Sequence, residues 1–171
     1  NCIRNITSDA FAGVASDESV DPRPICELLR QWSTLHPEFA HLPRKFKFAI
    51  NGAKADRTVL LCHDVGIELK HHILDDGSKQ LVADIYAGGG MGRTPMLGSL
   101  IYQALPWQSL PSYLTALLRV YNRFGRRDNL YKARIKILVK ALGPDEFARQ
   151  VQTEWQQIKD GDDDFTPAEW E

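Results

Sequence analysis

The sequence lacks the features that mark several classes of protein. Its three cysteines, at positions 2, 26 and 62, are too few and too scattered for a disulfide scaffold, and none forms the Cys-x-x-Cys pair of a zinc knuckle. No stretch approaches the roughly 18–20 consecutive apolar residues that a membrane-spanning helix needs. The net charge is −1, from 21 Lys and Arg against 22 Asp and Glu, which argues against a protein held to nucleic acid by bulk charge.

What is present is typical of one globular domain. The 171 residues are 43% apolar and 25% charged, and a single domain usually has about 100–200 residues. The first residue is Asn1 rather than an initiator Met, and no signal or transit pattern follows it. We therefore expect the chain to be a piece of a longer protein.

The first half of the chain shows the alternation that is typical of strands, with one helix between the first two of them. Apolar residues at positions 25, 28, 29 and 32 share one helical face, and His36-Pro37 is expected to end that helix. The strands are predicted at 1–7, 45–50, 67–73 and 80–86, with a hairpin turn at 75–78. Residues 58–62 are apolar but short, and both helix and strand remain open for them.

The second half of the chain, from Leu97 onward, shows helical patterning. Gly143-Pro144 predicts the end of one helix and the start of the next. The last twelve residues contain six acids and no base, so we expect residues 1–159 to form the domain and 160–171 an acidic tail or linker. Strands followed by a helical block predict an α+β fold with a mixed β-sheet covered by helices.

The first candidate site is the alternating segment Arg44-Lys45-Phe46-Lys47. Alternation places Lys45 and Lys47 on one face of a strand and Phe46 on the other. Two ammonium groups about 7 Å apart on one face repel each other. Such a pair is either a solvated surface pair or an anion site, in which a small oxyanion or a carboxylated cofactor neutralises both charges.

The second candidate site is the glycine-rich segment 88–95, Gly-Gly-Gly-Met-Gly-Arg-Thr-Pro. It is not a P-loop, which needs Gly-Lys followed by Ser or Thr, and its spacing is not that of a dinucleotide fingerprint. Four glycines after a strand indicate positive φ angles or a close approach of the backbone to another group. The loop therefore either packs tightly on a neighbouring element or supports a flat, bulky cofactor.

The third candidate site is a basic run at residues 119–140, with eight bases and one acid, Asp128. It is a solvated helical face, a site for the acidic groups of a cofactor, or a docking surface for an acidic protein. The acidic remainder of the chain and an expected lack of interleaved exposed aromatic residues argue against nucleic acid. The eight bases are Arg119, Arg123, Arg126, Arg127, Lys132, Arg134, Lys136 and Lys140.

Three motifs taken together resemble one family. Asn-x-x-Arg-Asn at the start of the chain, Leu-Pro-Arg-Lys-Phe-Lys at 42–47 and Gly-Gly-Gly-x-Gly-Arg-Thr-Pro at 88–95 resemble, in that order, the sirohaem-containing nitrite and sulfite reductases. The segment 126–136, Arg-Arg-Asp-Asn-Leu-Tyr-Lys-Ala-Arg-Ile-Lys, also resembles that family. The similarity extends over nearly the whole chain, to about Ile158.

The resemblance implies a fold like that of the nitrite/sulfite reductase 4Fe-4S domain. Members of the family catalyse the six-electron reduction of sulfite to sulfide, or of nitrite to ammonia, at a sirohaem joined through a cysteine thiolate to a [4Fe–4S] cluster. This chain resembles the sirohaem-facing portion of the first half of such an enzyme. The implied partners are the rest of the same polypeptide, a flavoprotein or ferredoxin that donates electrons, and a small anion. The implied location is the cytoplasm, without membrane attachment.

By motif position the resemblance also assigns roles to individual residues. It implies that Arg4, Lys45 and Lys47 bind the substrate anion and help to deliver protons on the distal face of sirohaem. Fixed cations there would stabilise the negative charge that builds up during reduction. The residues implied to surround the cofactor are Asn5, Arg44, Gly88, Gly89, Gly90, Gly92 and Arg93.

The cysteines depart from the family's pattern. The family holds its cluster with two Cys pairs, whereas Cys2, Cys26 and Cys62 are single. We therefore expect this chain to supply no cluster ligand and no proximal sirohaem ligand, and to be inactive by itself. Two other classes of function remain open: an anion- or nucleic-acid-binding module that uses residues 119–140, and a purely structural domain with solvated lysines.

Overall fold

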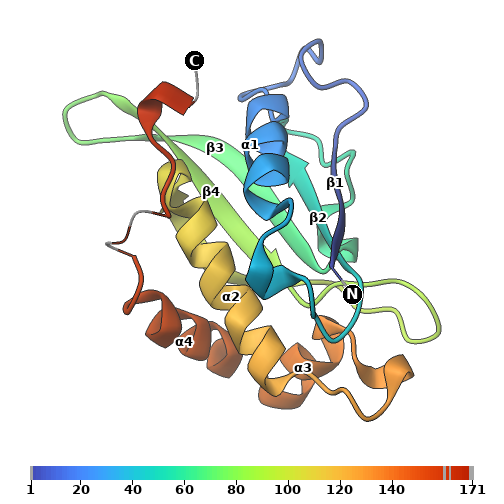
Figure 1. The fold of residues 1–171 in the computed structure, drawn as a ribbon. Coiled ribbons are helices and arrows are strands. Elements are labelled where there is room, and N and C mark those ends of the chain that lie inside the picture. The colour runs from blue at the N-terminus through green and yellow to red at the C-terminus, as the bar shows by residue number, and fades with distance from the viewer. Residues whose placement is uncertain (1, 160, 162, 170–171) are drawn as a thin grey trace.

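A mixed β-sheet forms the centre of the molecule (Figure 1). The computed structural model describes residues 2–159, 161 and 163–169. Neighbouring strands follow the chain order; β1–β2 and β2–β3 are parallel, whereas β3–β4 and β4–β5 are antiparallel. The strands are β1 (Ile3–Ser8), β2 (Phe46–Asn51), β3 (Val65–Ile73), β4 (Lys79–Ala87) and β5 (Ser99–Pro106). The predicted mixed sheet is confirmed.

Helices α1 and α2 lie in front of this sheet in Figure 1, and α4 packs against α2 and β5. The helices are α1 (Arg23–Ser33), α2 (Leu110–Phe124), α3 (Ile135–Leu142) and α4 (Pro144–Trp155). Short 3₁₀ turns lie at Pro37–Phe39, Leu60–Cys62, Trp107–Ser109, Leu130–Lys132 and Pro167–Glu169. The predicted break between α3 and α4 is confirmed, because Gly143 adopts φ +85° between them. The ambiguous segment 58–62 contains the turn at Leu60–Cys62.

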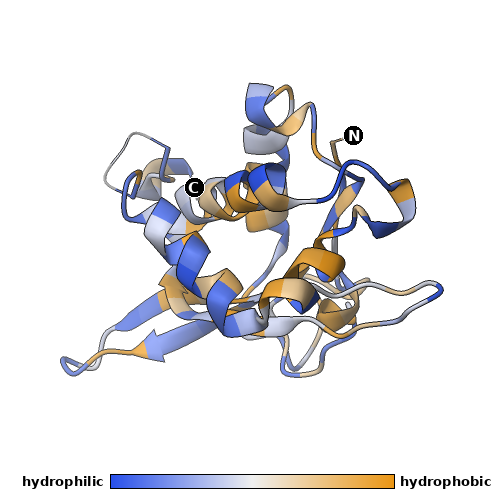
Figure 2. Cartoon of the chain, turned by 90° about the horizontal axis from the view of Figure 1, so that it is seen from below, coloured by the Kyte–Doolittle hydropathy of each residue, from blue (hydrophilic) through white to orange (hydrophobic). Residues whose placement is uncertain are grey.

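The alternation along β2 places its large apolar side chains on one face, while Ala49 and Asn51, on the face of Lys47, are also buried. Phe46, Phe48 and Ile50 are completely buried in the main core, and Lys47 between them is partly exposed. Side chains that pair across neighbouring strands share a face, so Val65 and Ile67 of β3 extend the same apolar surface. Hydrophobic residues accordingly concentrate where the helices meet the sheet (Figure 2).

The helices are attached to this core by apolar burial and by satisfied polar groups. The Tyr121 hydroxyl of α2 donates to the Ala133 carbonyl at 2.7 Å, which ties α2 to the segment that begins α3. The Trp155 indole of α4 donates to Ser112 Oγ of α2 at 2.9 Å. Both donors are buried, so each bond removes the cost of an unpaired polar group.

The prediction of helix from Leu97 onward is wrong for its first part, where the chain forms β5. Main-chain pairing with β4 decides the conformation: Tyr102 pairs with Ile85 and Leu100 with Tyr86. The register shifts twice along this pair, and Ala104 has φ +55° with its N–H donated to Asp84 Oδ1 at 2.7 Å. A strand with such irregularities loses the strict period-2 pattern by which a strand is recognised.

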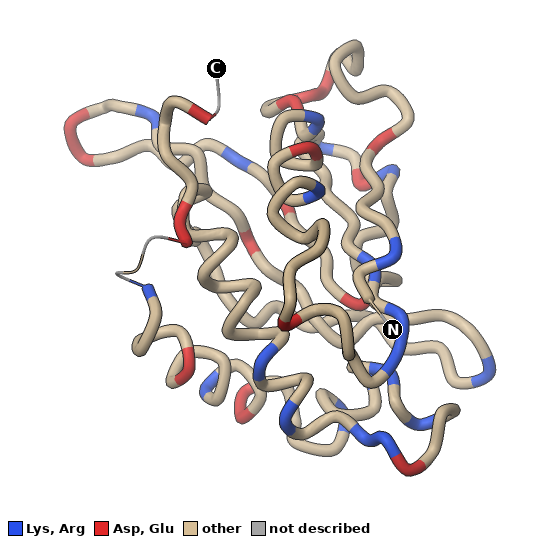
Figure 3. Tube along the Cα trace, in the orientation of Figure 1, with Lys and Arg blue, Asp and Glu red and all other residues tan. Residues whose placement is uncertain are grey.

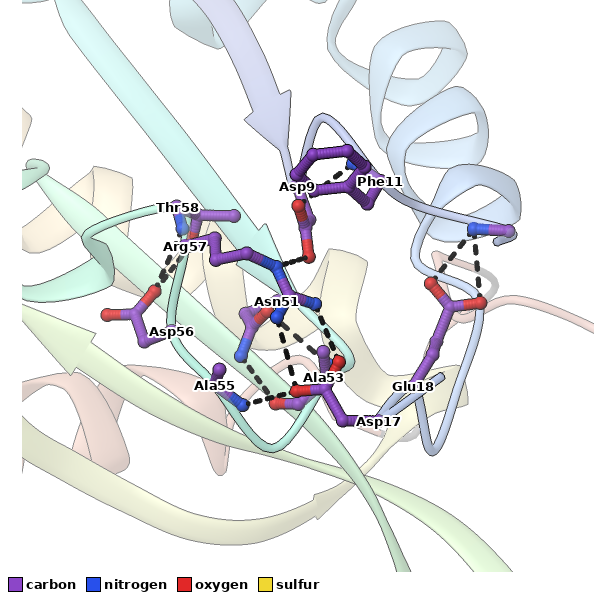
Figure 4. A network of polar contacts seen from close by, with 11 residues as sticks. Asp9, Phe11, Asp17, Glu18, Asn51, Ala53, Ala55, Asp56, Arg57 and Thr58 are labelled. Atoms are coloured by element: carbon purple, nitrogen blue, oxygen red, sulfur yellow. Dashed lines mark hydrogen bonds and ion pairs between the residues drawn. The ribbon is translucent and has the colours of Figure 1, made fainter. Parts of the chain in front are cut away.

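Hydrogen bonds from Arg57 to Asp9 and Asp17, which we call the arginine clasp, join the loops that follow β1 and β2 (Figure 4). Arg57 donates from Nε to Asp9 Oδ2 at 2.6 Å and from one terminal nitrogen to Asp17 Oδ1 at 2.9 Å. The Asp9 side chain is 2% exposed, and hydrogen bonding from Arg57 lowers the pKa of Asp17 to about 2. The clasp holds together the carboxyl ends of the first two parallel strands.

Part of the acidic segment after residue 159 returns to the core. Phe165 is 9% exposed and its ring stacks on Trp107 with 6.2 Å between centroids. Its backbone N–H donates to the Gln108 carbonyl at 2.9 Å. Residues 160, 162 and 170–171 lie outside the described part of the chain. The division into a domain at 1–159 and a tail at 160–171 stays a prediction.

Replacing Phe165 tests whether the packing of this C-terminal residue on the core contributes to the stability of the protein. We expect Phe165→Ala to lower the free energy of unfolding by about 3 kcal/mol, because a buried ring is lost. The matched control is Phe124→Ala, which removes a ring that is 50% exposed and should cost about 1 kcal/mol or less. Urea denaturation of both variants measures the difference, and equal midpoints would show that the segment contributes nothing.

Candidate functional site

A strongly basic hollow of about 740 Å³ opens at the end of the sheet where β2 begins and β4 ends. Among the described residues that line it, seven are Lys or Arg and none is Asp or Glu. We call this feature the basic hollow. Its basic residues are Arg44, Lys45, Arg93, Arg126, Lys132, Arg134 and Lys136, and Met91, Gly92, Thr94, Leu130, Tyr131 and Ile137 complete the lining.

Three segments that are far apart in the sequence build the basic hollow: residues 44–45 before β2, 91–94 after β4, and 126–137 around the start of α3. Figure 3 shows Lys and Arg gathered at this end of the molecule, whereas acidic residues colour the loop after β1 and the tip of the β3–β4 hairpin. The net charge of −1 therefore conceals a local excess of basic residues at this end.

Asp64 lies immediately before β3, and its side chain is 1% exposed. Its Oδ1 accepts hydrogen bonds from Arg134 Nε at 2.9 Å and from a terminal Arg134 nitrogen at 2.7 Å. Its Oδ2 accepts from the backbone N–H of Lys47 at 3.1 Å. Burial raises the pKa of the Asp64 carboxyl, and the Arg134 charge opposes that rise. Sequence reasoning missed this residue; an acid flanked by the apolar residues of 58–62 and of β3 was the available signal.

Lys136 fixes the shape of the glycine-rich loop. Its side chain is buried, and Nζ donates to the Thr94 carbonyl at 2.6 Å and to the carbonyls of Gly90 and Met91 at 3.4 Å each. Burial, and then the neighbouring charge of Arg134, lowers the pKa of Lys136. A buried ammonium that satisfies three loop carbonyls is a structural tie as well as part of the hollow's lining.

The four glycines of the loop serve two purposes. Gly92 lines the basic hollow, whereas Gly88, Gly89 and Gly90 are buried. A Cβ on Gly89 would lie 2.1 Å from the Leu61 carbonyl oxygen, so the backbone there approaches a neighbouring segment too closely for any side chain. Close packing on a neighbouring element therefore accounts for the first part of the loop, and exposure to the hollow for the second.

The structure brings together some of the cations predicted from the motifs. Arg44, Lys45 and Arg93 line the basic hollow, whereas Lys47 is not among its lining residues and only its backbone N–H bonds to Asp64. Asn5 pairs with Lys47 across β1 and β2, while a register shift between Ile3 and Asn5 makes Arg4 the extra residue. Arg4 is exposed and, with Asn5, lines a separate hollow of about 500 Å³ between β1 and α1.

The basic run at 119–140 is divided between two uses. Arg119 pairs with Glu38 at 2.7 Å, and Arg123 lies 3.7 Å from Glu154. Arg127 donates to the His41 carbonyl at 2.9 Å. The bases that line the hollow are Arg126, Lys132, Arg134 and Lys136. The tertiary structure therefore selects the C-terminal part of the run for the hollow and uses the rest to attach α2 to its neighbours.

Metal ligands are not grouped in the described part of the chain. Within residues 2–159, 161 and 163–169, no three His, Cys, Asp or Glu side chains gather so that they could hold a metal ion. Cys2, Cys26 and Cys62 are each free. Over the same residues, no helix has the length and apolar character needed to cross a membrane.

The tie made by Lys136 generates a prediction about stability. Lys136→Met keeps the buried methylene stem but removes the Nζ donor from the carbonyls of Met91 and Thr94, while the Gly90 carbonyl keeps its bond from the Met96 N–H. We therefore expect the free energy of unfolding to fall by about 2 kcal/mol. The control is Lys140→Met, at an exposed position of the same helix, where we expect a change within about 0.5 kcal/mol. Urea denaturation measures both, and equal stabilities would contradict the assigned tie.

Comparison with known proteins connects this geometry to one family. A family model of the nitrite and sulphite reductase 4Fe-4S domain matches residues 1–159. The chain is 32% identical over 160 residues to sulfite reductase (ferredoxin) 1 of Mycolicibacterium paratuberculosis, covering 91% of this chain and 27% of that protein. It is 29% identical to the ferredoxin–nitrite reductase of Synechococcus elongatus, covering 89% and 30% of the two chains.

Solved structures agree with the sequence matches. The structure of the Mycobacterium tuberculosis NirA protein has a TM-score of 0.75 at 30% identity, covering 91% of this chain and 28% of that one. Dissimilatory sulfite reductase I shares the fold, with a TM-score of 0.66 at 12% identity over 88% and 52% of the two chains. The chain spans 27–30% of the length of the two reductases named above. The motif resemblance is confirmed: the chain belongs to the nitrite and sulphite reductase 4Fe-4S domain family.

Proposed function

We propose that this chain is the sirohaem-facing domain of a sulfite or nitrite reductase and that the basic hollow holds the acidic groups of the cofactor. The observation that carries the proposal is the charge of the hollow: seven basic side chains and no acidic one among its described lining residues. Such a cluster of like charges is costly unless an anion of several charges neutralises it.

The residues of the hollow fit a macrocycle that bears several carboxylates. Guanidinium groups of Arg44 and Arg93 would each bind a carboxylate through paired hydrogen bonds. The exposed apolar side chains of Leu130 and Tyr131 offer surface to the uncharged parts of the ring. When bound, sirohaem coupled to a [4Fe–4S] cluster supplies the electrons for reduction of the anion.

Lys45 and Lys47 are the two lysines that support an anion site. Lys47 alternates with the buried Phe46 and Phe48 of β2, Lys45 immediately precedes that strand and lines the basic hollow, and both lysines are partly exposed. We assign to them binding of sulfite or nitrite and donation of protons from Nζ as negative charge develops on the anion. Arg4 precedes Asn5, the β1 residue that pairs with Lys47. We assign to Arg4 a supporting role as a further positive charge beside the two lysines.

The reaction needs more than this chain. The chain spans 27% of the length of the M. paratuberculosis sulfite reductase, and that relative's printed name includes ferredoxin. We propose that the remainder of a longer polypeptide supplies the cluster cysteines and that a ferredoxin or flavoprotein delivers the electrons. Nucleic-acid binding through residues 119–140 draws less support, because Arg119 and Arg123, which lie outside the hollow, are already paired with acids.

Substitution of the lysines tests the assigned roles. In a reductase that contains this chain, we expect Lys45→Met and Lys47→Met to lower turnover by about 100-fold or more, because a fixed charge is lost where negative charge develops. The bound sirohaem, measured by absorbance, should fall much less than turnover. Lys54→Met, at an exposed loop position, is the control. Near-normal turnover in both lysine variants would contradict the proposal.

A second test concerns the chain by itself. A [4Fe–4S] cluster needs four thiolate ligands, whereas this chain has three cysteines. We therefore expect reconstitution of the 171-residue chain with iron and sulfide to give no stoichiometric cluster and no reductase activity. Iron and sulfide analysis after gel filtration measures this, and a stable cluster on the isolated chain would overturn the expectation.

A further inference from the structure

Asp64 connects the sheet to the helical segment that lines the basic hollow. Its Oδ2 accepts from the Lys47 N–H of β2, and its own carbonyl accepts from the Gly88 N–H at 3.0 Å. Its Oδ1 accepts two bonds from Arg134, the residue immediately before α3. One buried residue thus contacts Arg134 in the lining of the hollow and also Lys47 of β2 and Gly88, which lie close in sequence to its other two lining segments.

The partner of Asp64 is a cation in a crowded position. The Arg134 side chain is 19% exposed and lines the basic hollow. A Cβ built on Gly90 would lie 3.2 Å from Lys136 Cδ and 3.3 Å from an Arg134 terminal nitrogen, so these two basic side chains lie close together. Their mutual repulsion would push the more exposed Arg134 outward unless a fixed negative charge held it.

We propose that Asp64 is a positioning residue for the basic hollow: it holds the Arg134 guanidinium at the wall of the hollow, where that group meets a carboxylate of the bound cofactor. The inference rests on the proposed function, because it concerns the same hollow. Two N–H groups of Arg134 converge on one buried oxygen and so restrict where the guanidinium can lie. The bonds from the Lys47 and Gly88 N–H groups anchor Asp64 to the sheet.

The direction in which one substitution changes cofactor binding distinguishes a positioning role of Asp64 from a purely electrostatic one. Asp64→Asn removes the negative charge that pairs with Arg134, one of the seven basic side chains that line the hollow. If charge alone mattered, the more positive hollow would bind an anionic cofactor more tightly. If Asp64 positions Arg134, binding weakens although the net charge has become more favourable.

The experiment uses a reductase that contains this chain and measures bound sirohaem per protein after gel filtration, by absorbance. We expect Asp64→Asn to weaken sirohaem retention by about tenfold, the scale of a coupling between contacting groups. The matched control is Asp128→Asn, which also removes the carboxylate partner of an arginine that lines the hollow, but at an exposed site. We expect retention within about twofold of wild type for this control.

A double variant tests whether Asp64 acts through Arg134. Arg134→Gln should weaken retention as Asp64→Asn does, and the double variant should be no weaker than Arg134→Gln alone, within about twofold. Independent, additive losses would overturn the inference and leave Asp64 a stabilising residue only.

A further variant covers the case in which Asp64→Asn fails to fold. Arg134→Lys keeps the charge in the hollow and loses the paired donors, so positioning predicts weaker retention at unchanged charge. Retention equal to wild type in Arg134→Lys, or tighter in Asp64→Asn, overturns the inference while the proposed function stands. A wild-type protein that holds no sirohaem overturns both.

Discussion

The two-sidedness of β2 is the constraint on which the rest of the structure depends. A pleated strand directs successive side chains to opposite faces, so burial of Phe46 and Phe48 beneath the helices forces Lys47 to the other face. A shift of register by one residue would expose two aromatic rings and bury ammonium groups, at a cost that the fold would not survive. The apolar core thus determines where the cations of the site lie.

The fold must also hold several positively charged side chains close together. The basic hollow gathers seven basic side chains from three segments, and the protein offsets their repulsion locally with buried acceptors. Asp64 takes the Arg134 guanidinium, and loop carbonyls take the Lys136 ammonium. At the far ends of β1 and β2 the arrangement is reversed, with Asp9 and Asp17 held by Arg57. The near-zero net charge reflects this separation.

A structural feature could be predicted from the sequence where it depends on residues that are close together along the chain. The α1 helix, strands β2 to β4 and the Gly143 break follow from periodicity and from conformational preferences of nearby residues, and the structure confirms them. Strand β5 does not, because its conformation is set by pairing with β4 across two register shifts. The sirohaem-reductase family was predictable because its motifs are short and contiguous.

By itself, the sequence determined the mixed α+β fold, the family and the face of β2 on which Lys47 lies, since each depends on spacing along the chain. The tertiary structure alone decided which of the eight bases at 119–140 line the hollow and which anchor α2. It alone paired Asp64 with Arg134, two residues separated by 70 positions. Such contacts depend on how the helices pack on the sheet. The periodicity of a sequence reports only on residues a few positions apart, so it cannot predict a contact between residues 70 positions apart.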